Sequence, residues 1–150
     1  DVTAEFYNPE KNEWFRAGEL RERVSRPGAA LLTDGRILLV GGFGRQGAAS
    51  QVLLYDPEKR VWTLGEELPV SRSRPAVVSL GTGLVLVTGG NFFIDNILYE
   101  ESTGRWMRAG KLTNSRRNLT GTLLKDGSVL IVGGEDRVQR TLPTVELYSP

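Results

Sequence analysis

The sequence contains no histidine and no cysteine among its 150 residues. Without histidine, the chain lacks the commonest general base and the commonest ligand of transition metals. Without cysteine, it has no disulfide, no thiolate nucleophile and no thiolate metal site. We therefore predict no catalytic residue, no metal site and no cofactor in this chain, and the cysteine count leaves its compartment open.

The chain also has no large excess of charge of either sign, since it contains 19 Lys and Arg residues and 18 Asp and Glu residues. A net charge of +1 gives no general attraction to nucleic acid or to a membrane surface. No apolar run approaches the roughly 18 residues of a membrane helix, and the N-terminus lacks the pattern of a signal peptide. We expect a soluble chain, either mature or excised from a longer one, without nucleic acid or membrane partners.

Turn-forming residues are abundant, with 18 glycines and 7 prolines, which indicates many short strands and an all-β class. The chain also repeats itself. A tyrosine precedes a tryptophan by seven residues three times, and a Gly-Gly pair follows each tryptophan at one constant distance. The three sets are Tyr7, Trp14 and Gly41-Gly42; Tyr55, Trp62 and Gly89-Gly90; and Tyr99, Trp106 and Gly133-Gly134, after which Tyr148 restarts the pattern.

Each repeat holds four segments of strand length, which in the second repeat are Ala29–Thr33, Arg36–Val40, Gln51–Tyr55 and Val61–Leu64. Asp34-Gly35 joins the first two segments and is a strong signal for a tight hairpin. Asp56-Pro57 lies between the last two and suits a type I turn. The length of the repeat varies only after the Gly-Gly pair, so we predict a surface loop there.

The second strand of each repeat is an uninterrupted apolar run, namely Ile37–Val40, Leu84–Val87 and Val129–Val132. A strand without alternation is expected to be buried on both faces. Sheets stacked face to face provide this burial, as the blades of a β-propeller do. The Tyr and Trp side chains then supply contacts between blades, and the glycines supply positive φ or close backbone approach.

This combination of Gly-Gly, Tyr and Trp resembles the kelch repeat, and the resemblance covers essentially all of the chain. It implies an all-β, kelch-type β-propeller with blades of four antiparallel strands and with the first strand of each blade nearest the central channel. We assign residues 1–26 to the end of one blade, 27–70 and 71–114 to complete blades, and 115–150 to an incomplete blade. About three blades cannot close a ring, because propellers close with about four to eight.

Two motifs that carry chemistry elsewhere have simpler interpretations here. Residues 42–47 spell GxGxxG, but a strand rather than a helix is predicted to follow, which argues against nucleotide binding. The carboxylate pairs Glu66-Glu67, Glu100-Glu101 and Glu135-Asp136 lack the spacing of a calcium loop, so we interpret them as solvated surface.

Arginines recur just before the first strand of each repeat, as in Ser25-Arg26-Pro27 and Ser71-Arg72-Ser73-Arg74-Pro75. The resemblance implies a binding role for these arginines. In kelch substrate adaptors, this loop and the loop after Gly-Gly open on one face and bind acidic peptides. Arginine suits bidentate capture of carboxylate. The candidate ligand-binding residues are Arg26, Arg72, Arg74, Arg116, Arg117 and Asn118 in the first set of loops, and Phe43, Arg45, Asn91, Phe92 and Arg137 in the second. The alternative is that these arginines pair with acidic groups of the adjacent blade and fasten the ring.

The predicted function is a propeller scaffold that binds a protein or an anionic ligand through this face. The alternative is part of a kelch-fold enzyme, a sugar-active epimerase, lyase or oxidase, with its catalytic residues outside this segment. A purely structural assembly module is a third possibility. Either a longer chain supplies the further blades, or a second copy does so to give a homodimer of six blades.

Overall fold

The computed structural model describes residues 3–20 and 23–150, and all regular secondary structure in them is β-strand. No helix in these residues has the length and hydropathy needed to cross a membrane. The strands are β1 (Thr3–Asn8), β2 (Glu13–Glu19), β3 (Gly28–Leu31), β4 (Ile37–Val40), β5 (Phe43–Gly44), β6 (Gly47–Ala48), β7 (Val52–Asp56), β8 (Val61–Leu64), β9 (Ala76–Ser79), β10 (Leu84–Thr88), β11 (Asp95–Glu100), β12 (Arg105–Lys111), β13 (Thr120–Leu123), β14 (Val129–Val132) and β15 (Val145–Tyr148).

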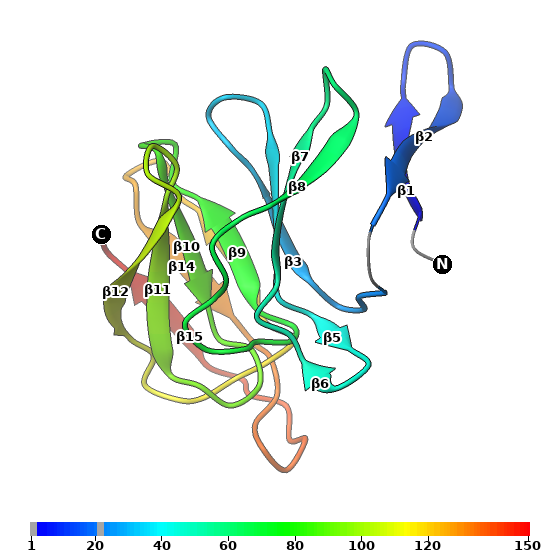
Figure 1. Cartoon of the computed structure of the whole chain (residues 1–150). Coiled ribbons are helices and arrows are strands. Elements are labelled where there is room, and N and C mark those ends of the chain that lie inside the picture. Colours follow the sequence, from blue (N-terminus) through cyan, green and yellow to red (C-terminus); the bar gives the residue numbers. More distant parts are fainter. Residues whose placement is uncertain (1–2, 21–22) are drawn as a thin grey trace.

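Two four-stranded antiparallel sheets form the centre of the molecule, in the orders β3-β4-β7-β8 and β9-β10-β11-β12. We call them blades C and D. A three-stranded sheet, β13-β14-β15, follows as blade F, and the hairpin β1-β2 lies at the opposite end (Figure 1). This is the predicted all-β arrangement of kelch blades without closure. The short hairpin β5-β6 was not predicted and forms within the loop after the first Gly-Gly pair.

Local sequence fixes the predicted turns. The Asp34-Gly35 and Asp126-Gly127 turns place glycine at φ values of 86° and 88°, a region that suits glycine. The Asn8 side chain accepts hydrogen bonds from the backbone N–H groups of Glu10 and Lys11, and Asp56 accepts the equivalent pair from Glu58 and Lys59. These side chains hold the outer hairpins without help from the core.

Burial between neighbouring blades produces the core. One apolar cluster lies between blades C and D and a second lies between blades D and F. In blade D, Val85, Leu86 and Val87 are all fully buried, so the prediction of a strand covered on both faces is correct there. In blade F, Ile131 is fully buried but Val132 is 40% exposed, because no blade covers the far face within the described residues.

The repeated aromatic residues form a tyrosine–tryptophan pair in each blade that has a fourth strand. The ring centroids lie 5.3 Å apart for Tyr7–Trp14 and 5.0 Å apart for Tyr99–Trp106. The Trp106 indole N–H donates to the carbonyl of Glu66 in the preceding blade at 2.9 Å. Trp106 therefore connects blades C and D as predicted, with an apolar body and a polar edge.

The Gly-Gly pairs allow successive blades to approach closely. Gly42 N–H donates to the Arg72 carbonyl at 2.7 Å, and Gly90 N–H donates to the Arg116 carbonyl at 2.9 Å. Gly41 has a φ of 62°, and a Cβ atom there would lie 2.3 Å from the Arg72 carbonyl oxygen. Both expected reasons for glycine, positive φ and close backbone approach, apply at this position.

Candidate binding face

The loops that precede the first strands are joined in a ladder across the blades. Arg74 N–H donates to the Arg26 carbonyl at 3.0 Å, and Asn118 N–H donates to the Arg74 carbonyl at 3.3 Å. These three residues have positive φ values of 56°, 59° and 56°, although none is glycine. Non-glycine residues in this region are strained, and the surrounding structure must hold them. The first strands of successive blades thus lie next to one another, and their loops meet at one rim.

Each of these loops is also bound to the loop after Gly-Gly in its own blade. Phe43 N–H donates to the Ser25 carbonyl at 2.7 Å, Asn91 N–H to that of Ser73 at 3.0 Å, and Glu135 N–H to that of Arg117 at 2.9 Å. The loops after Gly-Gly emerge on the side where β5-β6 lies in Figure 1. We call the two sets together the loop face: residues 25–27, 73–75 and 117–119 with residues 43–48, 91–94 and 135–142.

Two of the predicted binding residues, Arg72 and Arg116, do not reach the loop face. Arg72 is 1% exposed, and its guanidinium donates to the carbonyls of Gly89 at 2.7 Å and Asp95 at 2.6 Å. Burial lowers the pKa of Arg72, although an arginine remains charged. Arg116 is fully buried and donates to the carbonyls of Gly133 and Thr144, the Thr144 hydroxyl and the Glu146 carboxylate. Both arginines bind their own blade, so we leave them out of the candidate site.

Glu146 completes the Arg116 network. Its carboxylate lies 2.7 Å from Arg116 Nη2 and accepts the backbone N–H of Thr113 at 2.6 Å. Burial alone would raise the pKa of Glu146, but the N–H groups of Thr113 and Asn114 and the Arg116 charge together lower it. The ion pair therefore ties β15 to the loop before β13.

A second carboxylate, Glu135, joins blades D and F at the loop face. Its Oε1 atom accepts from Arg74 at 3.1 Å, from Arg117 at 2.9 Å and from the Asn118 amide at 2.6 Å. The interpretation of Glu135 as solvated surface was wrong, since its side chain is only 23% exposed and has three partners. The spacing of residues around Glu135 could not show this, because the two arginines that bind it come from two different loops. Arg74 thus has the alternative role considered above, in which an arginine pairs with an acidic group of the adjacent blade and holds the two blades together.

Beside this carboxylate, the ring of Phe92 lies close to two guanidiniums, those of Arg117 and Arg137. Arg117 lies 5.2 Å and Arg137 5.7 Å from the centroid of the Phe92 ring, within the range of cation–π attraction. Arg74 and Arg117 share the carboxylate of Glu135, and Arg137 adds a third guanidinium beside the same ring. The cluster carries surplus positive charge next to an aromatic surface.

The remaining predicted residues are spread over the other two blades. Arg26, Phe43 and Arg45 are exposed on blade C, and Phe43 has 52% of its surface accessible. The Asn91 amide accepts from the Ser73 hydroxyl at 2.7 Å and donates to the Ser71 carbonyl at 3.0 Å. Asn91 therefore shapes its loop, whereas the blade C residues leave their side chains accessible.

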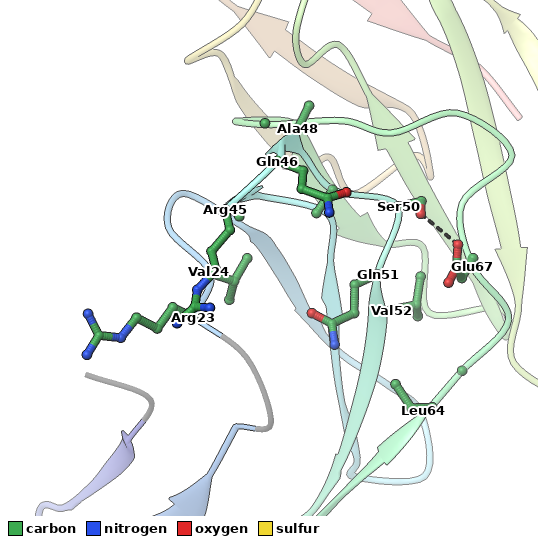
Figure 2. A pocket seen from close by; sticks show the side chains of 14 residues that line it. Arg23, Val24, Arg45, Gln46, Ala48, Ser50, Gln51, Val52, Leu64 and Glu67 are labelled. Carbon is green, nitrogen blue, oxygen red and sulfur yellow. Dashed lines mark hydrogen bonds between the residues drawn. The ribbon is translucent and has the colours of Figure 1, made fainter.

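A hollow of about 960 Å³ lies beside the hairpin β5-β6 and shares one residue, Arg45, with the predicted site. Arg23 and Arg45 lie on one side of it, and the hydrogen bond from Ser50 to Glu67 lies on the other (Figure 2). The GxGxxG segment forms this hairpin, and no helix follows it, in agreement with the argument against a dinucleotide site. Arg23, Gln46 and Gln51 also line the hollow, but they belong to no repeated pattern and could not be recognised from the sequence.

The comparisons with known proteins agree with this fold. Residues 24–69 match the Kelch motif family. No curated protein matches the chain. The solved structure titled "Structure of YjhT" superposes over 98% of this chain with a TM-score of 0.82 and 18% sequence identity. The chain covers 49% of that structure. Residues 24–69 thus carry a kelch motif, and the fold of the chain is that of β-propeller blades. The chain spans about half the length of that similar structure.

Proposed function

We propose that the chain is a non-enzymatic binding scaffold whose loop face binds a protein segment or another ligand that carries carboxylates. The observation that carries the proposal is a cluster in which Arg74 and Arg117 bind Glu135, while Arg117 and Arg137 lie over the Phe92 ring. A charged cluster held by backbone ladders is pre-organised, so little side-chain freedom is lost when a ligand binds. Further blades, from a longer chain or from a second copy, would complete the rim.

The geometry also supports different roles for the arginines of this cluster. Arg74 and Arg117 are about four-fifths buried and already bind Glu135, so they supply a fixed positive potential. Arg137 is exposed and held only by the Phe92 ring among the contacts of the described residues. Of the three arginines in this cluster, Arg137 therefore has the most freedom to form a bidentate pair with a ligand carboxylate. Arg26, Phe43 and Arg45 on blade C extend the same face.

The test is the binding of a fluorescein-labelled oligoglutamate peptide, followed by fluorescence anisotropy. We expect Arg137→Glu to weaken binding at least about tenfold, since it replaces one attractive contact with a repulsive one. Affinity should also fall as salt is raised, because the contacts lie at the surface.

The matched control is Arg108→Glu, which makes the same charge change at an exposed position of β12, outside the loop face. It should leave the affinity within about twofold of the unmodified chain. Equal losses in the two variants, or no loss with Arg137→Glu, would contradict the proposal.

A further inference from the structure

Two carboxylates of blade F bind arginine, but different kinds of donor hold them. Glu146 accepts the backbone N–H groups of Thr113 and Asn114, and both of its oxygens are used. Glu135 accepts only from side chains, all of them on Oε1, and no hydrogen bond among the described residues uses its Oε2 atom. Backbone donors move only with their segment, whereas side chains change rotamer freely. Glu146 is therefore a fixed part of its blade, and the bonds of Glu135 are the more easily exchanged.

Blades D and F stay joined without the Glu135 side chain. The Asn118 N–H donates to the Arg74 carbonyl at 3.3 Å, and a cluster of buried apolar side chains lies between the two blades. The backbone of Glu135 is itself paired with that of Arg117 in both directions, at 2.9 and 3.1 Å. A change of rotamer at Glu135 would therefore free its carboxylate while the loop and both blades keep their places.

Release of the Glu135 carboxylate leaves a ready site for another carboxylate. Three side-chain donors converge on the place of its Oε1 atom, at 3.1, 2.9 and 2.6 Å: Arg74 Nη1, Arg117 Nε and Asn118 Nδ2. Two of the three are charged, and charge-assisted hydrogen bonds to a carboxylate are the strong kind. All three come from blades D and F and are already in position, so little side-chain freedom is lost when a new acceptor arrives.

We propose that Glu135 is an internal competitor for the ligand of the loop face, and that this ligand is a segment with at least two carboxylates. One ligand carboxylate displaces that of Glu135 and accepts from its three former donors. The second binds Arg137, whose guanidinium forms no hydrogen bond among the described residues. The inference rests on the proposed function and extends it, because Arg74 and Arg117 then contact the ligand directly.

The need for two carboxylates follows from the exchange itself. When one carboxylate replaces another on the same donors, the number of ion pairs is unchanged and little affinity is gained. The additional pair with Arg137 supplies the gain, as a charge-assisted hydrogen bond made only in the complex. A ligand with one carboxylate cannot have both contacts. Internal competition thus lets the loop face distinguish an acidic segment from an isolated carboxylate.

The experiment uses the full chain and the fluorescein-labelled oligoglutamate peptide in fluorescence anisotropy. Glu135→Gln should lower the dissociation constant at least about tenfold, because the amide keeps the shape of the side chain but competes for the arginines without a charge. A labelled oligoglutamine peptide with a single glutamate should bind the unmodified chain at least about tenfold more weakly than oligoglutamate does.

Glu101→Gln is the matched control. Glu101 accepts the Thr33 N–H at 2.9 Å and so joins blades C and D, but it follows the end of β11 that lies away from the loop face. The substitution removes the same charge from a contact between blades, and it should leave the affinity within about twofold of that of the unmodified chain.

Two further measurements separate exchange from a change in local charge. Adding Arg74→Ala to Glu135→Gln should raise the dissociation constant at least about tenfold again, because Arg74 has become a direct ligand contact. In the unmodified chain, saturation with oligoglutamate should shift the NMR signals of the Arg117 Nε–H and of the Asn118 side-chain amide, since both change their acceptor.

The inference is overturned if Glu135→Gln does not tighten binding, if Glu101→Gln tightens it equally, or if Arg74→Ala has no effect in the double variant. Equal affinity for the peptide with one glutamate also overturns it. If Arg137→Glu weakens binding in any of these cases, the proposed function stands without the inference. If no variant binds the peptide, both fail.

Discussion

Replacing Arg116 with alanine is expected to lower the free energy of unfolding by about 3–5 kcal/mol, as breaking a buried ion pair commonly does. The Arg116 side chain is fully buried, and its removal takes the positive charge away from the Glu146 carboxylate and one donor away from each of the carbonyls of Gly133 and Thr144. Such losses are costly because the buried charge and carbonyls do not recover an equivalent partner from water. Urea titration monitored by tryptophan fluorescence measures the loss.

Arg72→Ala provides the comparison within the same protein. Arg72 is equally buried but donates to two carbonyls, and no carboxylate of the described residues binds it. Its replacement should cost less than that of Arg116, in the range of about 1–3 kcal/mol. The reverse order, or no loss in either variant, would contradict the structural role given to these arginines.

Replacing Gly41 with alanine is the second substitution with a large expected effect, a loss of at least about 3 kcal/mol. Alanine at a φ of 62° is strained by about 1–2 kcal/mol. Its Cβ atom would also lie 2.3 Å from the Arg72 carbonyl oxygen, so blades C and D must separate locally. That separation weakens the bond from Gly42 N–H to the same carbonyl and costs further free energy. The shift of the thermal midpoint, together with urea titration, measures the effect.

Gly35→Ala separates the two causes. Gly35 has a φ of 86°, and no atom lies within 4 Å of the position of an added Cβ. This variant should show the backbone strain alone, about 1–2 kcal/mol. If Gly41→Ala costs no more than Gly35→Ala, the close approach of the blades at Gly41 does not matter for stability.

Much of the fold could be read from the sequence because its signals are local. The Asp34-Gly35 turn, the Asx turns at Asn8 and Asp56 and the apolar run of β10 each depend on a few consecutive residues. The hairpin β5-β6 was missed because a two-residue strand leaves too few positions for any alternation to show.

The candidate site was predicted less well, and the arginines show why. Arg72 and Arg74 are two residues apart in one loop, yet the first is fully buried and the second reaches the loop face. Arg116 and Arg117 are adjacent and divide in the same way. Residue type and spacing therefore do not distinguish an arginine that is buried in its own blade from one that reaches the loop face. The direction of each side chain follows from backbone angles that neighbouring blades impose.

The sequence by itself determined the repeat, the four-stranded blades, the turns and the need for glycine after each second strand, since propensity and short-range geometry decide these features. The tertiary structure alone decided which arginines are structural, how Glu135 joins blades D and F, and which faces stay open. These depend on contacts between residues up to 61 positions apart. Long-range contacts arise from the stacking of blades, and no single repeat contains that information.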